Sequence, residues 1–392
     1  MNKITPADYL PLLCLIFTGI EGTADIHFHC VKQFAIQRAE ARAMNLRPSK
    51  TAWLAVVGAF ALFACAGSVS AQSLRRVVVL TDIGPEGPAD EDDLQSMIRF
   101  MLYTNEFEVE ALIATKIGGG GVRKDYIQNV VNAYGKVRPN LLLHRSGYPT
   151  SSFLLGRIKA GHSSALTEDI GPAGDSEGSN AIIAAVDKPD ARPVFVVIWG
   201  GSYDLAQALW RVRNDRGSAA ANQFASKIRV HCDGDQYAPT GPWIRSNFPS
   251  LFWIHDGPTA SDSWTWTENR LRTPLRGFYL GGDASFVSVS WINANLKGHG
   301  PLGDMYPIYA GGVNGVKDAH PYLEFIVGGL HDPEKPTWGG WGGEIRRHRP
   351  AIFQHGARQR RRGDLGPRHR LAMAPGVHER LRGPYGLVRQ TV

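Results

Sequence analysis

RVVVLT, residues 76–81, is the stretch that decides the fold, and Asp82 follows it directly. The stretch holds three consecutive Val and one Leu, with no alternation of apolar and polar side chains. A continuous β-branched run of this kind is typical of a strand that is buried on both faces, as in parallel sheets covered by helices. We therefore predict a buried strand here, with its carboxyl end at Asp82.

Strand-like and helix-like segments alternate along the chain after this strand. Residues 92–103 have the spacing of a helix, with Leu94, Met97 and Ile98 on one side. Further strands are predicted at residues 107–115, 141–144, 193–199 and 227–232, and further helices at residues 123–137, 179–186 and 204–212. This alternation predicts an α/β domain over residues 74–345, built on a doubly wound, mostly parallel sheet.

Acidic residues collect where the predicted strands end. Asp82 ends the first strand, residues 90–93 (DEDD) open the next helix, and Asp233 and Asp235 follow the strand at 227–232. In a doubly wound sheet, ligands bind outside the carboxyl ends of the strands. Clustered carboxylates repel one another unless a cation or proton intervenes, and oxygen ligands favour Ca²⁺ or Mg²⁺ over zinc. Helix capping explains one or two acids at 90–93 but not Asp82, so we expect a metal site.

Six blocks carry a family resemblance: LTDIGPEGPADEDDLQSMIRFMLYTNEFEVEALIAT, WGGSYDLAQAL, SKIRVHCDGDQ, GPWIRSNFPSLFWI, HGPLGD and WGGWGG. In this order they resemble the nucleoside-hydrolase-like domain of secreted cellulose-binding proteins. The resemblance covers residues 77–343, and it is specific because several blocks agree. The broader superfamily implied is that of the calcium-dependent, inosine- and uridine-preferring nucleoside hydrolases, which have an open α/β fold.

The resemblance implies roles for five residues. Asp82 matches the base and a calcium ligand, Asp93 matches a second ligand, and Asp92 matches the carboxylate that holds the sugar hydroxyls. SYDLA is similar to a Thr-Asn-Leu-Ala turn whose main-chain carbonyl binds calcium, and Tyr203 occupies the Thr position. Asp318 looks like the distal carboxylate ligand. Ca²⁺ is therefore the expected cofactor.

Three features depart from the pattern of the true hydrolases. Asp82 and Asp92 are ten positions apart, so residues 84–89 form an insert between acids that the hydrolases hold in a tighter loop. The second strand ends at Thr115 without the ligand-binding Asn of the hydrolases. No His immediately precedes Asp318, so no acid for the leaving group is evident. These departures weaken the prediction of nucleoside hydrolysis more than they weaken the prediction of calcium binding.

Two functions follow. The first is hydrolysis of an N-glycosyl (ribosyl) bond, in which Asp82 takes a proton from a calcium-bound water that attacks an oxocarbenium-like sugar. The alternative is a cellulose- or polysaccharide-binding protein that keeps the fold without turnover. Its support is the family's cellulose association and a set of Trp side chains that could stack on sugars. Trp199 is our candidate for substrate contact; the others are Trp243, Trp253, Trp264, Trp266, Trp338 and Trp341. We expect a nucleoside or carbohydrate ligand.

The net charge of +7 does not describe the folded body. Residues 346–392 hold 12 Arg, no Lys and two acids, a net +10, so the other 345 residues carry −3. A third hypothesis, nucleic-acid binding, therefore concerns the tail only, and we expect none in the body. The tail has no apolar periodicity and no strand-like segment, so we expect it to be disordered or the product of a frameshift.

Residues 44–71 have the pattern of a signal peptide. Arg47 and Lys50 precede an apolar stretch at 52–66, and Val-Ser-Ala at 69–71 suits cleavage. As a helix the apolar stretch spans about 22 Å, less than the roughly 30 Å of a bilayer core, so no stable membrane span is expected. We expect a secreted or periplasmic protein. A lipoprotein attached through Cys65 is the minor alternative, and residues 1–43 are interpreted as an over-extended start.

Overall fold

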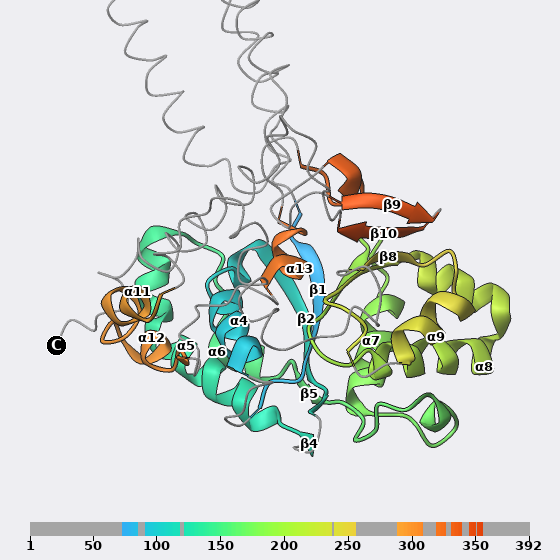
Figure 1. The fold of residues 1–392 in the computed structure, drawn as a ribbon, viewed down its shortest axis with the longest axis horizontal. Helices are drawn as coiled ribbons and strands as arrows, with labels where there is room; N and C mark the ends of the chain where they lie inside the picture. Colours follow the sequence, from blue (N-terminus) through green and yellow to red (C-terminus); the bar gives the residue numbers. More distant parts are fainter. Residues whose placement is uncertain are drawn as a thin grey trace, which may run out of the picture. The chain divides into compact units, whose positions relative to one another are not determined.

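β1 (Arg75–Thr81) pairs with β2 (Phe107–Ala114) on one side and with β6 (Val194–Ile198) on the other (Figure 1). The computed structural model describes residues 73–84, 91–117, 121–236, 239–255, 288–308, 319–326, 331–338, 345–349 and 351–355. Apart from Ser73, these residues belong to one compact unit, Leu74–Val392. The predicted signal segment at 44–71 and the residues before it lie outside the described residues.

The strands of the described main sheet follow the order β5-β2-β1-β6-β7-β8-β10-β9. The remaining strands are β5 (Ile158–Ala160), β7 (Ile228–Cys232), β8 (Phe252–His255), β9 (Ile345–Arg349) and β10 (Ile352–His355), and a separate pair joins β3 (Lys116–Ile117) to β4 (Gly121–Val122). In the main sheet all neighbours are parallel except β10 and β9. Val79 lies opposite Leu112 of β2 and Val197 of β6. The predicted mostly parallel α/β sheet is confirmed.

Alternate residues of β1 face two separate apolar cores. Val77 and Val79 belong to one core, and Val78 and Leu80 to the other. The first core is covered by α4 (Glu91–Met101), α5 (Lys124–His144), α11 (Val289–Asn295), α12 (Pro301–Asp304) and α13 (Ala319–Leu323), and the second by α7 (Glu177–Asp187), α8 (Tyr203–Ser226) and α9 (Thr240–Asn247). Figure 1 shows α4 and α5 on the opposite side of β1 and β2 from α7 and α8. Cover on both faces explains why RVVVLT lacks alternation.

Shorter elements complete the described fold: η2 (Thr104–Glu106), α6 (Ser151–Leu155), η3 (Thr167–Asp169) and η6 (Pro336–Trp338).

The strand predicted at residues 141–144 was wrong, because these residues form the last turn of α5. Buried side chains recur at Val130, Tyr134, Val137 and Leu141, which is helical spacing carried past Pro139. Leu143 is 80% exposed, as suits the outer face of a helix end and not an inner strand. The third strand of the main sheet along the chain is instead the short β5.

Two strands continue the sheet where we expected none. β9 begins at Ile345, and β10 pairs in parallel with β8, with Phe353 opposite Ile254. The expectation that the tail from residue 346 has no strand-like segment is therefore wrong for residues 346–349 and 352–355. The signal was weak because β9 reads IRRHR, with four basic residues in five, and a charged sequence of this kind is tolerated at the edge of a sheet.

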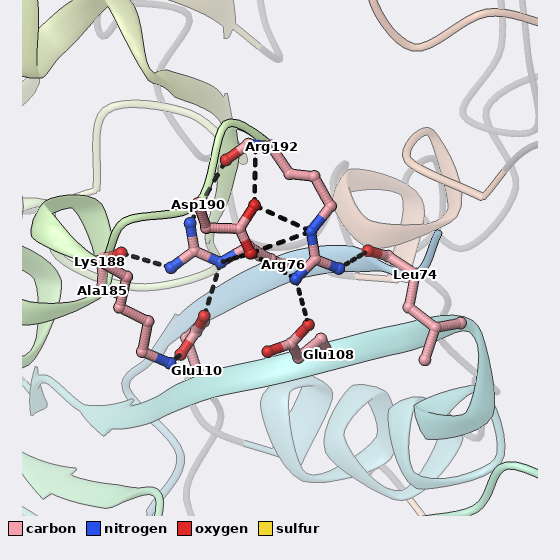
Figure 2. A network of polar contacts seen from close by, with 8 residues as sticks. All are labelled: Leu74, Arg76, Glu108, Glu110, Ala185, Lys188, Asp190 and Arg192. Carbon is pink, nitrogen blue, oxygen red and sulfur yellow. Dashed lines mark hydrogen bonds and ion pairs between the residues drawn. The ribbon is translucent and has the colours of Figure 1, made fainter. Parts of the chain in front are cut away.

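An ionic network around the buried pair of Arg76 and Glu110 ties the amino end of β1 to its neighbours (Figure 2). The Arg76 guanidinium donates to Glu110 of β2 at 2.7 Å and to the carbonyl of Ala185 in α7. Lys188 also pairs with Glu110. Arg192 joins Asp190 at 2.5 Å, Glu108 at 2.6 Å and the carbonyl of Leu74 at 2.7 Å. The network lies at the end of β1 opposite Asp82, so it holds the strand without contributing to the carboxyl edge.

No helix among the described residues is long and apolar enough to cross a membrane. The predicted signal segment is not among those residues, so its role stays a prediction.

Candidate functional site

Three strand ends meet where the strand order reverses, between β1 and β6. Asp82 follows β1, Thr115 follows β2, and Trp199 follows β6. The backbone N–H of Thr115 donates to the carbonyl of Thr81 at 2.7 Å, and that of Trp199 donates to the carbonyl of Leu80 at 2.8 Å. β2 lies on one side of β1 and β6 on the other, so the strand order reverses here. Doubly wound sheets bind ligands at this edge.

Three carboxylates predicted for the site are buried at this edge. Asp82, Asp92 and Asp93 are 3%, 7% and 2% exposed. The hydroxyl of Thr81 donates to Oδ2 of Asp93, and the N–H of Asp93 lies 3.2 Å from Oδ1 of Asp92. The first turn of α4 is thereby fastened to the end of β1. Helix capping alone does not explain Asp93, whose partner is a strand residue.

The oxygen chemistry of this cluster fits a hard cation such as Ca²⁺. Within the part of the chain that the structure describes, no group of three His, Cys, Asp or Glu side chains is arranged to hold a metal ion. Asp90 and Asp318, the predicted distal ligand, lie outside that part. The calcium site therefore stays a prediction, with Asp82 and Asp93 as its described side-chain candidates.

Tyr203 is the first residue of α8, just after the loop that ends β6. Its phenol donates to the carbonyl of Asp169 at 2.6 Å, and its ring stacks on His162 with centroids 4.7 Å apart. Burial raises the pKa of the Tyr203 phenol well above its usual value. The side chain is therefore a neutral donor that fastens the loop at 162–169, and the predicted role of its main-chain carbonyl as a calcium ligand remains a prediction.

Asp204 is a candidate that sequence reasoning missed. It is 1% exposed, and its Oδ1 accepts from the Ser176 hydroxyl at 2.5 Å and from the His162 N–H at 3.0 Å. Burial raises the pKa of Asp204 to about 6. A signal was available, because Asp204 stands in SYDLA where the similar motif has Asn. Burial of an ionised carboxylate costs more free energy than burial of an amide, so Asp in place of Asn indicates an unusual environment at position 204.

Asp235, one of the acids predicted at the end of β7, is paired with a cation. Its two carboxylate oxygens each accept from the Arg245 guanidinium at 2.7 Å. Asp233 is buried in the expected place, and its N–H donates to the carbonyl of Ile198 at 2.9 Å. Asp235 is thus neutralised by α9, and Asp233 is the acid that remains at this strand end.

Trp199 does not present a stacking surface, which corrects its predicted contact with substrate. Its side chain is 0% exposed, and its ring packs edge-on against Phe100 and Tyr322 at 6.1 and 5.8 Å. Trp253 is also fully buried, whereas Trp338 is 63% exposed. A flat face for a sugar is therefore available at Trp338, away from the predicted position; Trp264, Trp266 and Trp341 lie outside the described residues.

Comparisons with known proteins agree with the fold and with the resemblance. A family model described as "Cellulose-binding Sde182, nucleoside hydrolase-like domain" matches residues 76–345. The chain is also similar to a solved structure of a nucleoside hydrolase-related hypothetical protein from Saccharophagus degradans that is associated with carbohydrate metabolism. The identity is 29% over 81% of this chain and 73% of that chain, with a TM-score of 0.63. No curated protein matches this chain.

Proposed function

This chain belongs to the family of the cellulose-binding, nucleoside hydrolase-like domain, and from that premise we propose that it hydrolyses a glycosidic bond of N-ribosyl type. The observation that carries the proposal is the burial of Asp82, Asp92 and Asp93 together at the switch point of the sheet. Carboxylates prefer water, so burial of three of them at the ligand-binding edge of a doubly wound sheet is unusual and favours a role in ligand binding.

The residues have separate tasks in the proposed reaction. Asp92 accepts hydrogen bonds from the hydroxyls of the sugar and fixes the ring. Asp82 accepts a proton from the attacking water, and general bases of this kind contribute about 10²–10⁴-fold to the rate. The remaining negative charge of the cluster stabilises the positive charge that develops on the sugar ring.

A calcium ion is part of the proposal. Asp82 and Asp93 would hold it, together with the main-chain carbonyl of Tyr203 and the carboxylate of Asp318. When bound, Ca²⁺ supplies Lewis-acid activation of water at neutral pH. Asp93 is oriented for this task by the hydroxyl of Thr81, which donates to its Oδ2.

The test is release of nitrophenol from p-nitrophenyl β-D-ribofuranoside by the purified chain, in 1 mM CaCl₂ and in EDTA. We expect calcium-dependent turnover that Asp82→Asn lowers by about 10²-fold or more. Asp215→Asn is the matched control, because Asp215 is half exposed on α8 and outside the site. Absence of turnover by the unmodified chain would refute the hydrolase proposal. Turnover that survives in Asp82→Asn would remove the role of Asp82 alone.

A second candidate function is binding of cellulose or a related polysaccharide without turnover. Trp338 favours it, because its ring is 63% exposed. Lys335 Nζ lies 4.2 Å from the ring centroid and would have to move before a sugar could stack on that face. Exposed aromatic faces stack on sugar rings. In a pull-down on insoluble cellulose, Trp338→Ala should lose retention while Asp82→Asn keeps it. Equal retention of both variants and the unmodified chain would exclude Trp338 from the binding surface.

Export is the last element of the proposal. Residues 44–71 would act as a signal peptide, with Gln72 as the first residue of the mature chain. Mass spectrometry of the N-terminus of protein recovered from the periplasm or medium checks this. A chain that is recovered uncleaved from the cytoplasm would exclude it.

A further inference from the structure

Thr115 is buried where the ends of β1, β2 and β6 meet. It is 2% exposed, and its backbone N–H donates to the carbonyl of Thr81 at 2.7 Å. This hydrogen bond fixes Thr115 beside Asp82, the residue that directly follows Thr81 and β1. Thr115 has no part in the proposed reaction as stated above.

The hydroxyl of Thr115 is the exception among the buried threonines of the described chain. Thr81 donates to Asp93, Thr104 donates to the carbonyl of Met101 at 2.9 Å, and the hydroxyl of Thr240 pairs with that of Ser202 at 2.7 Å. Oγ1 of Thr115 is buried and has no hydrogen-bond partner within the described residues. Buried hydroxyls are nearly always satisfied, since an unmet one costs free energy of folding.

The orphaned hydroxyl lies close to the main chain of Asp82. A Cβ atom placed on Gly200 would lie 2.7 Å from Oγ1 of Thr115 and 2.7 Å from the backbone nitrogen of Asp82. Gly200 therefore packs directly against the Thr115 hydroxyl and the main chain of Asp82. The three residues follow three different strands, so the Thr115 hydroxyl lies beside the residue that carries the first carboxylate of the cluster.

The chemistry of the cluster leaves a task for this hydroxyl. Ionised carboxylates only accept hydrogen bonds, whereas a sugar hydroxyl has one proton to donate and two lone pairs to satisfy. A hydroxyl that donates to Asp92 still needs a donor for its oxygen. The Thr115 hydroxyl is such a donor, and it has no competing partner among the residues that the structure describes.

We infer that Thr115 is a ligand-contacting residue, whose hydroxyl donates a hydrogen bond to a hydroxyl oxygen of the sugar held at Asp82 and Asp92. The inference rests on the proposed function only in taking a sugar as the ligand of this site. It does not require turnover, so it holds equally for a hydrolase and for a sugar-binding protein.

Thr115→Val tests the inference, because valine keeps the shape and removes the hydroxyl. Two quantities are measured: the melting temperature of the free protein, and the affinities for D-ribose and cellobiose by isothermal titration calorimetry. We expect an unchanged or higher melting temperature, because no internal hydrogen bond is lost. We expect about tenfold weaker affinity for the sugar that the unmodified chain binds, which corresponds to about 1.4 kcal/mol. Thr115→Ser should restore most of that loss.

Thr104→Val is the matched control. Its hydroxyl donates to Met101 within the chain, and it precedes β2 at the other end of that strand. This change should lower the melting temperature and leave sugar affinity as it is, the reverse of the pattern for Thr115→Val.

Three results would overturn the assignment. If the unmodified chain binds neither sugar, the sugar-binding site itself is refuted, and the role of Thr115 with it. If it binds a sugar and Thr115→Val binds equally well, only the role of Thr115 is refuted. A lower melting temperature of the free Thr115→Val protein would show that the hydroxyl has an internal, structural partner.

Discussion

Gly200 and Asp82 approach so closely that a side chain at position 200 cannot be accommodated without movement. A Cβ atom there would lie 2.7 Å from the backbone nitrogen of Asp82 and 2.8 Å from its Cβ. The atoms in the way belong to the main chain and to the first side-chain carbon, so rotation of a flexible side chain cannot relieve the contact. The closeness of β6 to β1 at the site therefore depends on glycine.

Gly200→Ala should move the ends of β1 and β6 apart. We expect a loss of about 1–3 kcal/mol in the free energy of unfolding, as for other overpacked sites. The loss of free energy of sugar binding, or of transition-state stabilisation, should exceed the loss in the free energy of unfolding, because Asp82 moves with the strand end. Urea denaturation measures the first effect and titration with the bound sugar the second.

Gly171→Ala is the control for that change. Gly171 is also buried, but a Cβ atom there would meet nothing within 4 Å. Its substitution should leave both stability and binding close to those of the unmodified chain. Equal effects at the two glycines would contradict the role assigned to the contact between Gly200 and Asp82.

Arg76→Met should strongly destabilise the fold without touching the site. The side chains of Arg76 and Glu110 are 1% and 2% exposed, and removal of one partner leaves a buried carboxylate with Lys188 alone. Breaking a buried pair in this way typically costs about 3–5 kcal/mol. Urea denaturation gives the loss. Arg216→Met is the comparison, because its pair with Asp187 is about 40% exposed on both sides and should be worth at most about 1 kcal/mol.

The parts of the fold that could be predicted from sequence are those set by local pattern. RVVVLT at residues 76–81 was correctly predicted as a buried strand, since a run without alternation suits a strand covered on both faces. The same criterion failed for residues 141–144, because over four residues an apolar run at the end of a helix cannot be distinguished from a short buried strand. Only the longer spacing from Val130 to Leu141 distinguishes the helix.

Sequence alone could predict the acids of the candidate site that follow strand ends. It could not predict residues whose role depends on partners that are distant in sequence. Asp82 and Asp93 were placed at the edge correctly. The sequence shows at Thr115 only that an Asn is missing, because the lack of a partner for its hydroxyl becomes visible when the described neighbours are placed. Asp235 was assigned to the cluster because no sequence pattern shows that Arg245 of α9 neutralises it.

The buried carboxyl of Asp204 should make stability fall as pH rises from about 4 to about 6. Burial raises its pKa from 3.8 to about 6, so the folded protein holds the proton more tightly than the unfolded chain does. Below about pH 4 the group is protonated in both states, and above that the unfolded chain loses its proton first. Each pKa unit amounts to about 1.4 kcal/mol of stability.

Asp204→Asn removes this dependence, since the amide oxygen can still accept from Ser176 and His162. Urea denaturation at pH 4 and pH 7 should show the variant gaining about 3 kcal/mol relative to the unmodified chain between the two values. Asp215→Asn, at a half-exposed position, should show no such gain. A difference between the Asp204 variant and the unmodified chain that is constant across this pH range would contradict the prediction.

Removal of calcium gives the last prediction, because the acids at the end of β1 repel one another when no cation is present. With Ca²⁺ at about 100 times its dissociation constant, the fold should gain about 2.7 kcal/mol over the same protein in EDTA. Asp93→Asn should lose most of this gain and yet be at least as stable as the unmodified chain in EDTA, since one of the repelling charges is gone while the Thr81 hydroxyl keeps an acceptor. Thermal denaturation with CaCl₂, MgCl₂ or EDTA measures both effects. A calcium-dependent gain that Asp93→Asn retains in full would exclude Asp93 as a ligand, and equal melting temperatures of the unmodified chain in all three would exclude the site.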